Sequence, residues 1–111
     1  RAAQVTAAAD ALGNRGLEPS VIVDCSHGTS EKQPERQQAV VSELCQQLRD
    51  GQGALRGVMI ESHLLGGAQK LTPGKPLTFG QSITDACLAL TDTVPLLEAI
   101  ANAVRDSGRA V

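Results

Sequence analysis

Two short apolar runs on either side of a helical pattern constrain the fold of this chain more than any other feature. Residues 21–25 (VIVDC) are rich in β-branched side chains and predict a buried strand, and residues 57–60 (GVMI) predict a second. Between them a helix is expected over about 34–49, with Pro34 in its first turn. Its apolar residues recur at helical spacing: Val40, Val41, Leu44, Cys45 and Leu48. Strands joined through a helix lie parallel, so the sequence predicts an α/β fold.

The same alternation continues on both sides of this unit. An Ala-rich helix is expected over residues 2–12, a long loop with Gly and Pro over 63–80, and a third strand near 82–90. A last helix is expected after a cap at Asp92 or Thr93. Its apolar stripe comprises Val94, Leu97, Ile100, Ala101 and Val104. Parallel sheets normally contain more strands than three, so residues 1–111 are expected to form a single piece of a larger α/β protein.

Composition argues against two classes of partner. The formal net charge is −2 and Phe79 is the only aromatic residue, so the chain offers neither the basic surface nor the stacking side chains that bind nucleic acid. No apolar run approaches the roughly 18 residues of a membrane span. Cys25, Cys45 and Cys87 match no zinc spacing and leave one cysteine unpaired, which is typical of a reduced, cytoplasmic protein.

A polar side chain accompanies each predicted strand near its carboxyl end. Residues 21–25 lead into His27, residues 57–60 lead into Glu61, and the third strand contains Asp85. The carboxyl ends of parallel strands meet at one edge of a sheet or one mouth of a barrel. An imidazole with two carboxylates is a ligand set for a divalent metal such as Mn, Fe, Co or Zn. In the alternative interpretation, His27 is a hydrogen-bonded loop residue, Glu61 is a solvated strand end and Asp85 is a turn cap.

Alternation along the strands predicts which residues lie below this site. Val23 and Cys25 share a face with His27, and Gly57 and Met59 share a face with Glu61. Small and apolar residues beneath a polar tip fit the filled interior of a barrel. We therefore expect Cys25 to be a core residue and not a nucleophile. Cys45 belongs to the helix stripe and is also expected in the core. Cys87 has no evident activating base.

Four further polar residues are open to two interpretations each. Lys32, Lys70 and Lys75 either contact an anionic substrate or are solvated surface residues, and the second is favoured. His63 either lines the mouth or makes an ordinary hydrogen bond.

Three blocks of the sequence resemble one family, the type I 3-deoxy-D-arabino-heptulosonate 7-phosphate (DAHP) synthases. They are residues 24–33 (DCSHGTSEKQ), 57–64 (GVMIESHL) and 80–87 (GQSITDAC), and the resemblance extends over essentially the whole chain. It implies a metal-dependent (β/α)8 TIM barrel that condenses phosphoenolpyruvate with erythrose 4-phosphate and releases phosphate, in the shikimate pathway of aromatic amino-acid biosynthesis. By motif, His27, Glu61 and Asp85 are similar to the family's catalytic metal ligands.

The resemblance also indicates what lies elsewhere in such an enzyme. The family's cysteine ligand and its Lys and Arg phosphate-binding motifs precede the matched region. The chain begins with Arg1 and its only methionine is Met59, so we expect the C-terminal third of a barrel, with its last three strand–helix units and no activity alone. Either homo-oligomers or association with the rest of the barrel are expected. The alternatives are the related 3-deoxy-D-manno-octulosonate 8-phosphate synthase and a free-standing, non-catalytic α/β binding domain.

Overall fold

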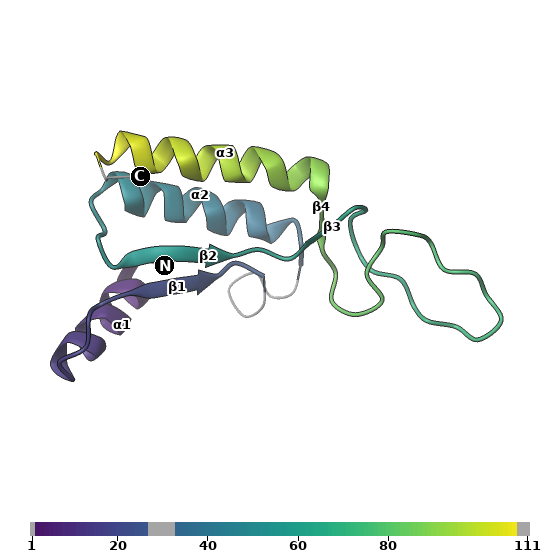
Figure 1. Ribbon diagram of the computed structural model, residues 1–111, viewed down its shortest axis with the longest axis horizontal. Coiled ribbons are helices and arrows are strands. Elements are labelled where there is room, and N and C mark those ends of the chain that lie inside the picture. The colour runs from purple at the N-terminus through teal and green to yellow at the C-terminus, as the bar shows by residue number, and fades with distance from the viewer. Residues whose placement is uncertain (1, 27–32, 109–111) are drawn as a thin grey trace.

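The computed structural model describes residues 2–26 and 33–108, which form a small α/β structure. Its elements are α1 (Ala2–Asn14), β1 (Val21–Asp24), α2 (Arg36–Arg49), β2 (Leu55–Met59), β3 (Ser62–His63), β4 (Leu88–Ala89) and α3 (Leu90–Asp106). Helices α2 and α3 lie side by side over one face of the β1–β2 pair, and α1 lies beyond β1 (Figure 1). None of the helices in the described part of the chain is both long and apolar enough to cross a membrane.

The strands form two short parallel pairs. Strand β1 pairs with β2, from Val21 opposite Leu55 to Asp24 opposite Met59, with an irregularity after Val21. Strand β3 pairs with β4. The strands are parallel as predicted, but the prediction of one three-stranded sheet is wrong for the described residues, where the two pairs are separate.

The predicted third strand is much shorter than expected. Only Leu88 and Ala89 form β4, and Asp85 lies in an exposed bend before it, so the prediction that this strand contains Asp85 is wrong. The physical reason is local pairing, because Ser82 forms a bridge with Ala68 and Cys87 forms one with Gly67. These bridges hold residues 82–87 against the preceding loop and away from β2.

The core lies between the β1–β2 pair and the two packed helices. It comprises Cys25, Val41, Leu44, Cys45, Leu48, Leu55 and Ala103. The predicted stripe of α2 is confirmed, because Val41, Leu44, Cys45 and Leu48 are all buried. Fully burying a leucine or valine side chain contributes about 1.5–3 kcal/mol, so this stripe is the main stabilising contact of the fold.

The predicted faces of β1 are reversed in the structure. Val23 packs with Cys25 against the helices, so these residues do not face a barrel interior. The opposite face carries Ile22, which is 72% exposed and lies against Gly57, and Met59, which is 44% exposed. Apolar residues occur on both faces of β1, so alternation alone does not tell which face meets the helices.

Helix α3 begins earlier than predicted and packs through a different stripe. It starts at Leu90 after the extended residue Ala89, so neither Asp92 nor Thr93 is its cap. Thr93 is instead buried, and its hydroxyl donates to the Ala89 carbonyl across one helical turn (3.1 Å). The packed residues are Leu96, Ala99, Ile100, Ala103 and Val104, so the predicted Ile100 and Val104 are confirmed. Val94 and Leu97 lie outside this stripe, and about half of each is exposed.

Residues 64–87 form a long arm that projects from the body (Figure 1). A loop was predicted here over 63–80, but His63 belongs to β3 and the arm continues to residue 87. The Gln69 side chain holds the two sides of the arm together, because its Nε2 donates to the carbonyls of Thr78 (2.7 Å) and Gln81 (3.0 Å). Its Oε1 accepts from the Thr78 N–H at 2.8 Å. The arm is therefore an ordered element with internal hydrogen bonds.

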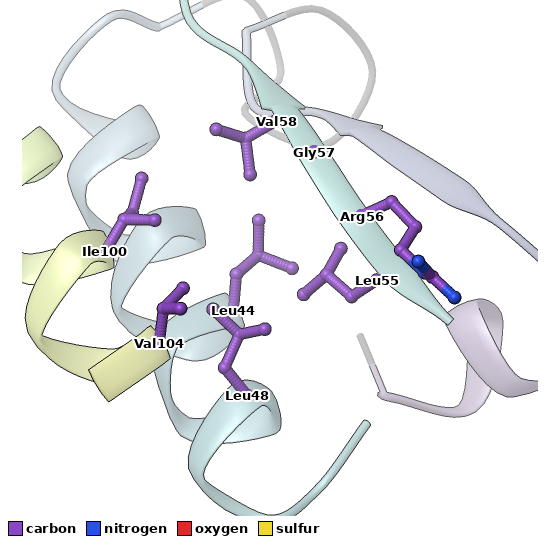
Figure 2. Close-up of a pocket in the computed structure, with 8 residues that line it drawn as sticks. All are labelled: Leu44, Leu48, Leu55, Arg56, Gly57, Val58, Ile100 and Val104. Carbon is purple, nitrogen blue, oxygen red and sulfur yellow. The ribbon is translucent and has the colours of Figure 1, made fainter. Parts of the chain in front are cut away.

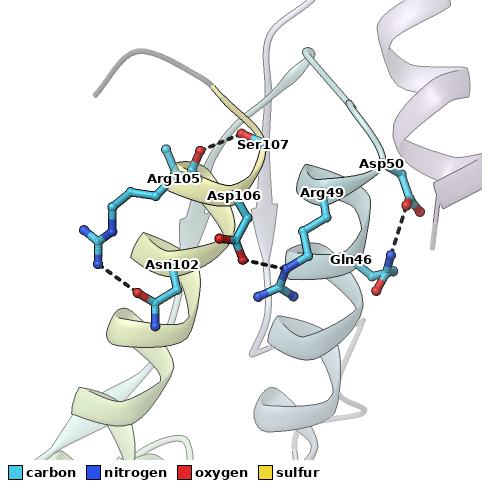
Figure 3. A network of polar contacts seen from close by, with 8 residues as sticks. Gln46, Arg49, Asp50, Asn102, Arg105, Asp106 and Ser107 are labelled. Atoms are coloured by element: carbon cyan, nitrogen blue, oxygen red, sulfur yellow. Dashed lines mark hydrogen bonds and ion pairs between the residues drawn. The ribbon is translucent and has the colours of Figure 1, made fainter.

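Polar contacts join the carboxyl-terminal ends of α2 and α3 (Figure 3). Arg49 Nε donates to Asp106 Oδ2 at 3.2 Å, and Gln46 Nε2 donates to Asp50 Oδ1 at 2.9 Å. The Arg49 and Asp106 side chains are 40% and 60% exposed. Exposed ion pairs contribute about 0–1 kcal/mol, so this contact aligns the helix ends more than it stabilises them.

Candidate metal centre

A side-chain turn fixes the chain at the end of β1. Asp24 Oδ1 accepts hydrogen bonds from the Ser26 N–H (2.8 Å) and the Ser26 hydroxyl (2.6 Å). The intervening Cys25 N–H donates to the Met59 carbonyl at 2.9 Å, the last backbone bond between the two strands. His27, the first predicted ligand, and Lys32 follow this turn and lie outside the described residues.

Glu61, the second predicted ligand, lies between β2 and β3, where three hydrogen bonds hold its backbone. Its N–H donates to Gln37 Oε1 (3.0 Å), and its carbonyl accepts from Gln37 Nε2 (3.1 Å). The carbonyl also accepts from the Leu88 N–H at 3.0 Å. Helix α2 and strand β4 therefore both contact the backbone of this residue.

Cys87 lies close to two of the predicted ligands. Burial raises the pKa of its thiol, and the nearby negative charges of Glu61 and Asp85 raise this pKa further. A hydrogen bond with Ser82 acts in the opposite direction. The structure thus brings both predicted carboxylates near one thiol, although they come from segments 24 residues apart in the sequence. The thiol form is favoured here, which does not suit an activated nucleophile.

The metal-ligating arrangement is incomplete in the described residues. Within 2–26 and 33–108, no group of three or more histidine, cysteine, aspartate and glutamate side chains is arranged to hold a metal ion. Glu61 is partly buried and Asp85 is exposed. Carboxylate oxygens are suitable ligands for divalent cations, but the described residues do not by themselves form a metal site.

The other predicted residues have simple environments. His63 is exposed, and its Nδ1 accepts from the Leu64 N–H at 2.8 Å. Lys70 and Lys75 are exposed on the arm. Cys25 and Cys45 are buried, as predicted, and burial with the Asp24 charge raises the pKa of Cys25 to about 11.

Two polar residues of this region were not predicted from the sequence. Gln37 is fully buried and Thr93 is 7% exposed. Gln37 precedes Val41 by four residues, so it occupies a position of the apolar stripe of α2. A polar residue at such a position is the sequence signal that indicates a buried hydrogen-bonding role.

An apolar hollow of about 240 Å³ between α2, α3 and β2 is separate from this site (Figure 2). Its lining comprises Leu44, Leu48, Leu55, Arg56, Gly57, Val58, Ile100 and Val104. Arg56 is its only ionisable residue, and the guanidinium donates to the Gly53 carbonyl (3.1 Å) and to Glu18 (3.4 Å). The hollow therefore holds no acid, base or nucleophile for catalysis.

Comparison with known proteins shows the family of this chain. A family model described as the DAHP synthetase I family matches residues 1–98. The chain belongs to this family. Among DAHP synthetase I relatives, the Trp-sensitive phospho-2-dehydro-3-deoxyheptonate aldolase of Escherichia coli O6:H1 is 48% identical over 100 residues, 90% of this chain and 29% of the relative. The Phe-sensitive enzyme of Escherichia coli K12 is 47% identical over 96 residues, 86% of this chain and 27% of the relative.

A solved structure of the same name is also similar. The phospho-2-dehydro-3-deoxyheptonate aldolase of Francisella tularensis SCHU S4 superposes with a TM-score of 0.75 and 43% sequence identity, over 79% of this chain and 25% of that one. This DAHP synthetase I chain spans less than a third of the length of the curated relatives it matches.

Proposed function

We propose that this chain is the C-terminal part of a (β/α)8 barrel enzyme that joins phosphoenolpyruvate and erythrose 4-phosphate to give DAHP and phosphate. The relatives and the similar solved structure are named phospho-2-dehydro-3-deoxyheptonate aldolase. The observation that carries the proposal is the position of Glu61 just beyond the carboxyl end of β2, where hydrogen bonds with Gln37 and Leu88 hold its backbone. Sites in β/α barrels form at this end of the strands.

In this proposal, His27, Glu61 and Asp85 are the catalytic residues and hold a divalent ion, which is Mn, Fe, Co or Zn. A metal bound there supplies Lewis-acid activation of the aldehyde oxygen. Glu61 follows β2 and Asp85 lies in the arm, so the two carboxylates supply oxygen ligands from two different segments.

We also propose that this chain is inactive alone and associates with the rest of the barrel or with other subunits. The two substrates are phosphorylated and need cationic partners, whereas the charges that act on Cys87 are the carboxylates of Glu61 and Asp85. Lys70 and Lys75 are exposed on the arm. The exposed side chains of Ile22 and Met59 fit a sheet face that the rest of a cytoplasmic barrel or oligomer covers.

A hybrid enzyme tests this function. In the hybrid, this chain replaces the segment that it matches in the Phe-sensitive Escherichia coli enzyme. We expect the hybrid to consume phosphoenolpyruvate only when erythrose 4-phosphate and Mn²⁺ are present, and this chain alone to be inactive. Glu61→Gln and Asp85→Asn should each abolish turnover, because each removes a charged oxygen ligand.

The matched control is Glu98→Gln, which removes an exposed carboxylate from α3 and should leave turnover unchanged. A folded hybrid with no condensation activity would overturn the proposed reaction. Full Mn²⁺-dependent turnover in Glu61→Gln would overturn the assignment of the metal site.

A further inference from the structure

Gln37 is fully buried although its side chain is polar. In the described part of the chain, both hydrogen bonds of its side chain are made with one residue of the candidate site, Glu61. It lies in the first turn of α2. Its carboxamide donates to the Glu61 carbonyl and accepts from the Glu61 N–H, at 3.1 and 3.0 Å. In a β-sheet, the backbone of a neighbouring strand makes the same two bonds, because it donates to the residue's carbonyl and accepts from its N–H.

This contact begins where the pairing of β1 and β2 ends. In the described residues the Cys25 N–H makes the last ladder bond, to Met59, and the N–H of the next residue, Ser26, bonds the Asp24 side chain and not β2. In a continued parallel ladder, the Glu61 N–H would bond a carbonyl of the first strand. Leaving a buried N–H without a partner is unfavourable, and the Gln37 amide supplies this partner.

We propose that Gln37 is a positioning residue for Glu61. The paired hydrogen bonds fix the peptide planes on both sides of the Glu61 Cα, and these planes determine the direction of its Cα–Cβ bond. The direction in which the Glu61 side chain leaves the backbone is thereby set by the contact with Gln37. The inference rests on the proposed role of Glu61 as a metal ligand.

Helix α2 provides a matched control for this role. Gln47 is also buried on α2, but its side-chain oxygen and nitrogen have no hydrogen-bond partner among the described residues. Gln37→Met and Gln47→Met therefore remove the same group from the same helix. Only the first removes a contact with Glu61.

Amide hydrogen exchange in the full chain, measured by NMR, tests the backbone contact. We expect Gln37→Met to lower the protection factor of the Glu61 N–H by tenfold or more and to leave those of Val41 and Leu44 within about threefold. Gln47→Met should leave Glu61 unchanged. Unchanged protection at Glu61 in Gln37→Met, or an equal loss at Val41 and Leu44, would overturn the inference.

A conservative variant keeps the test decisive if Gln37→Met does not fold. The carboxyl oxygen of Gln37→Glu can accept from the Glu61 N–H, as the amide oxygen does. Protection at Glu61 should therefore stay within about threefold of that in the parent chain. A loss of protection in a folded Gln37→Glu variant as large as that expected of Gln37→Met would contradict the inference.

Mn²⁺ affinity of the hybrid enzyme tests the consequence for the site. Residues that orient a metal ligand typically change metal affinity by 10–100-fold, so Gln37→Met should weaken Mn²⁺ binding at least tenfold, and Gln47→Met should not. Affinity in Gln37→Met equal to that of the parent hybrid would overturn the positioning role. If Glu61→Gln leaves Mn²⁺ binding unchanged, the proposed function fails instead, and amide exchange still decides the backbone contact.

Discussion

The hydroxyl groups of Ser62 and Thr93 lie 2.7 Å apart, and this hydrogen bond joins β3 to the first turn of α3. Thr93 has a single hydroxyl hydrogen, which it donates to the Ala89 carbonyl at 3.1 Å. Ser62 is therefore the donor in the bond between the two hydroxyls. Because Ser62 directly follows Glu61, the bond connects the candidate site to the last helix.

Replacement of Thr93 by valine should destabilise this connection. Thr93→Val keeps the shape of the side chain but removes the acceptor for Ser62 and the donor to Ala89, so we expect the free energy of unfolding to fall by about 1–2 kcal/mol. Urea denaturation measures the change. Thr91→Val on the exposed face of α3 is the control and should stay within about 0.5 kcal/mol. Equal effects of the two substitutions would show that the buried hydroxyl contributes nothing.

Gly80 should be the least replaceable glycine of the arm. Its φ is +81°, and an added Cβ would lie 2.9 Å from the Leu64 Cβ. Gly74 has nearly the same φ, +80°, but open space around it. A left-handed backbone conformation costs a non-glycine residue about 1–2 kcal/mol, and both alanine variants share this cost. Only Gly80→Ala adds a steric clash with Leu64.

Amide exchange of Leu65 separates these two effects, because its N–H donates to the Gly80 carbonyl at 2.8 Å. Gly80→Ala should lower protection of Leu65 by tenfold or more, and Gly74→Ala should change it by less than threefold. If both variants lower it equally, backbone strain alone accounts for the effect and the contact with Leu64 does not matter.

The sequence predicted the packed helix α2 well and the strands less well. The spacing of Val41, Leu44, Cys45 and Leu48 allows only one helical face, and that face is the one buried. Strand β1 has apolar side chains on both faces, so its alternation is correct but its orientation depends on helices distant in sequence. The short β4 likewise results from bridges to the arm, which no local pattern reveals.

For the candidate site, the sequence predicted the place of only one residue in the structure. Glu61 follows β2 as expected, whereas Asp85 lies in a bend and His27 is outside the described residues, so the predicted ligand set stays a prediction. The role of Gln37 was not predicted, because its bond to Glu61 spans 24 residues. Hydrogen bonds over such a separation depend on the packing of α2 on the strands.

Stability should fall in alkaline solution because of the buried thiol of Cys45. Burial raises its pKa, and the positive charge of Arg49 opposes the shift only in part. Above the ordinary thiol pKa the unfolded chain releases this proton while the folded chain keeps it, so the free energy of unfolding falls as pH rises. One thiol contributes at most about 1.4 kcal/mol per pH unit to this slope.

Urea denaturation at a series of pH values measures the slope, and Cys45→Ala should make it smaller even though the cavity lowers stability at every pH. Replacement of the more exposed Cys87 by alanine in the same series shows how much a less buried thiol contributes. A slope that Cys45→Ala does not change would contradict the prediction.

This chain, studied alone, should self-associate through the uncovered face of its β1–β2 pair. Ile22 is 72% exposed there and Met59 is 44% exposed, although both are large apolar side chains. Contiguous apolar surface and unpaired strand edges both favour association. Sedimentation velocity should therefore show mass that increases with protein concentration.

Ile22→Lys should shift the distribution toward the 11.5 kDa monomer, because a charge on this face must be desolvated when it is covered. Gln38→Lys adds the same charge at an exposed position of α2 and should leave association unchanged. If both lysine variants dissociate the protein equally, charge repulsion is the cause, and the open sheet face is not the contact.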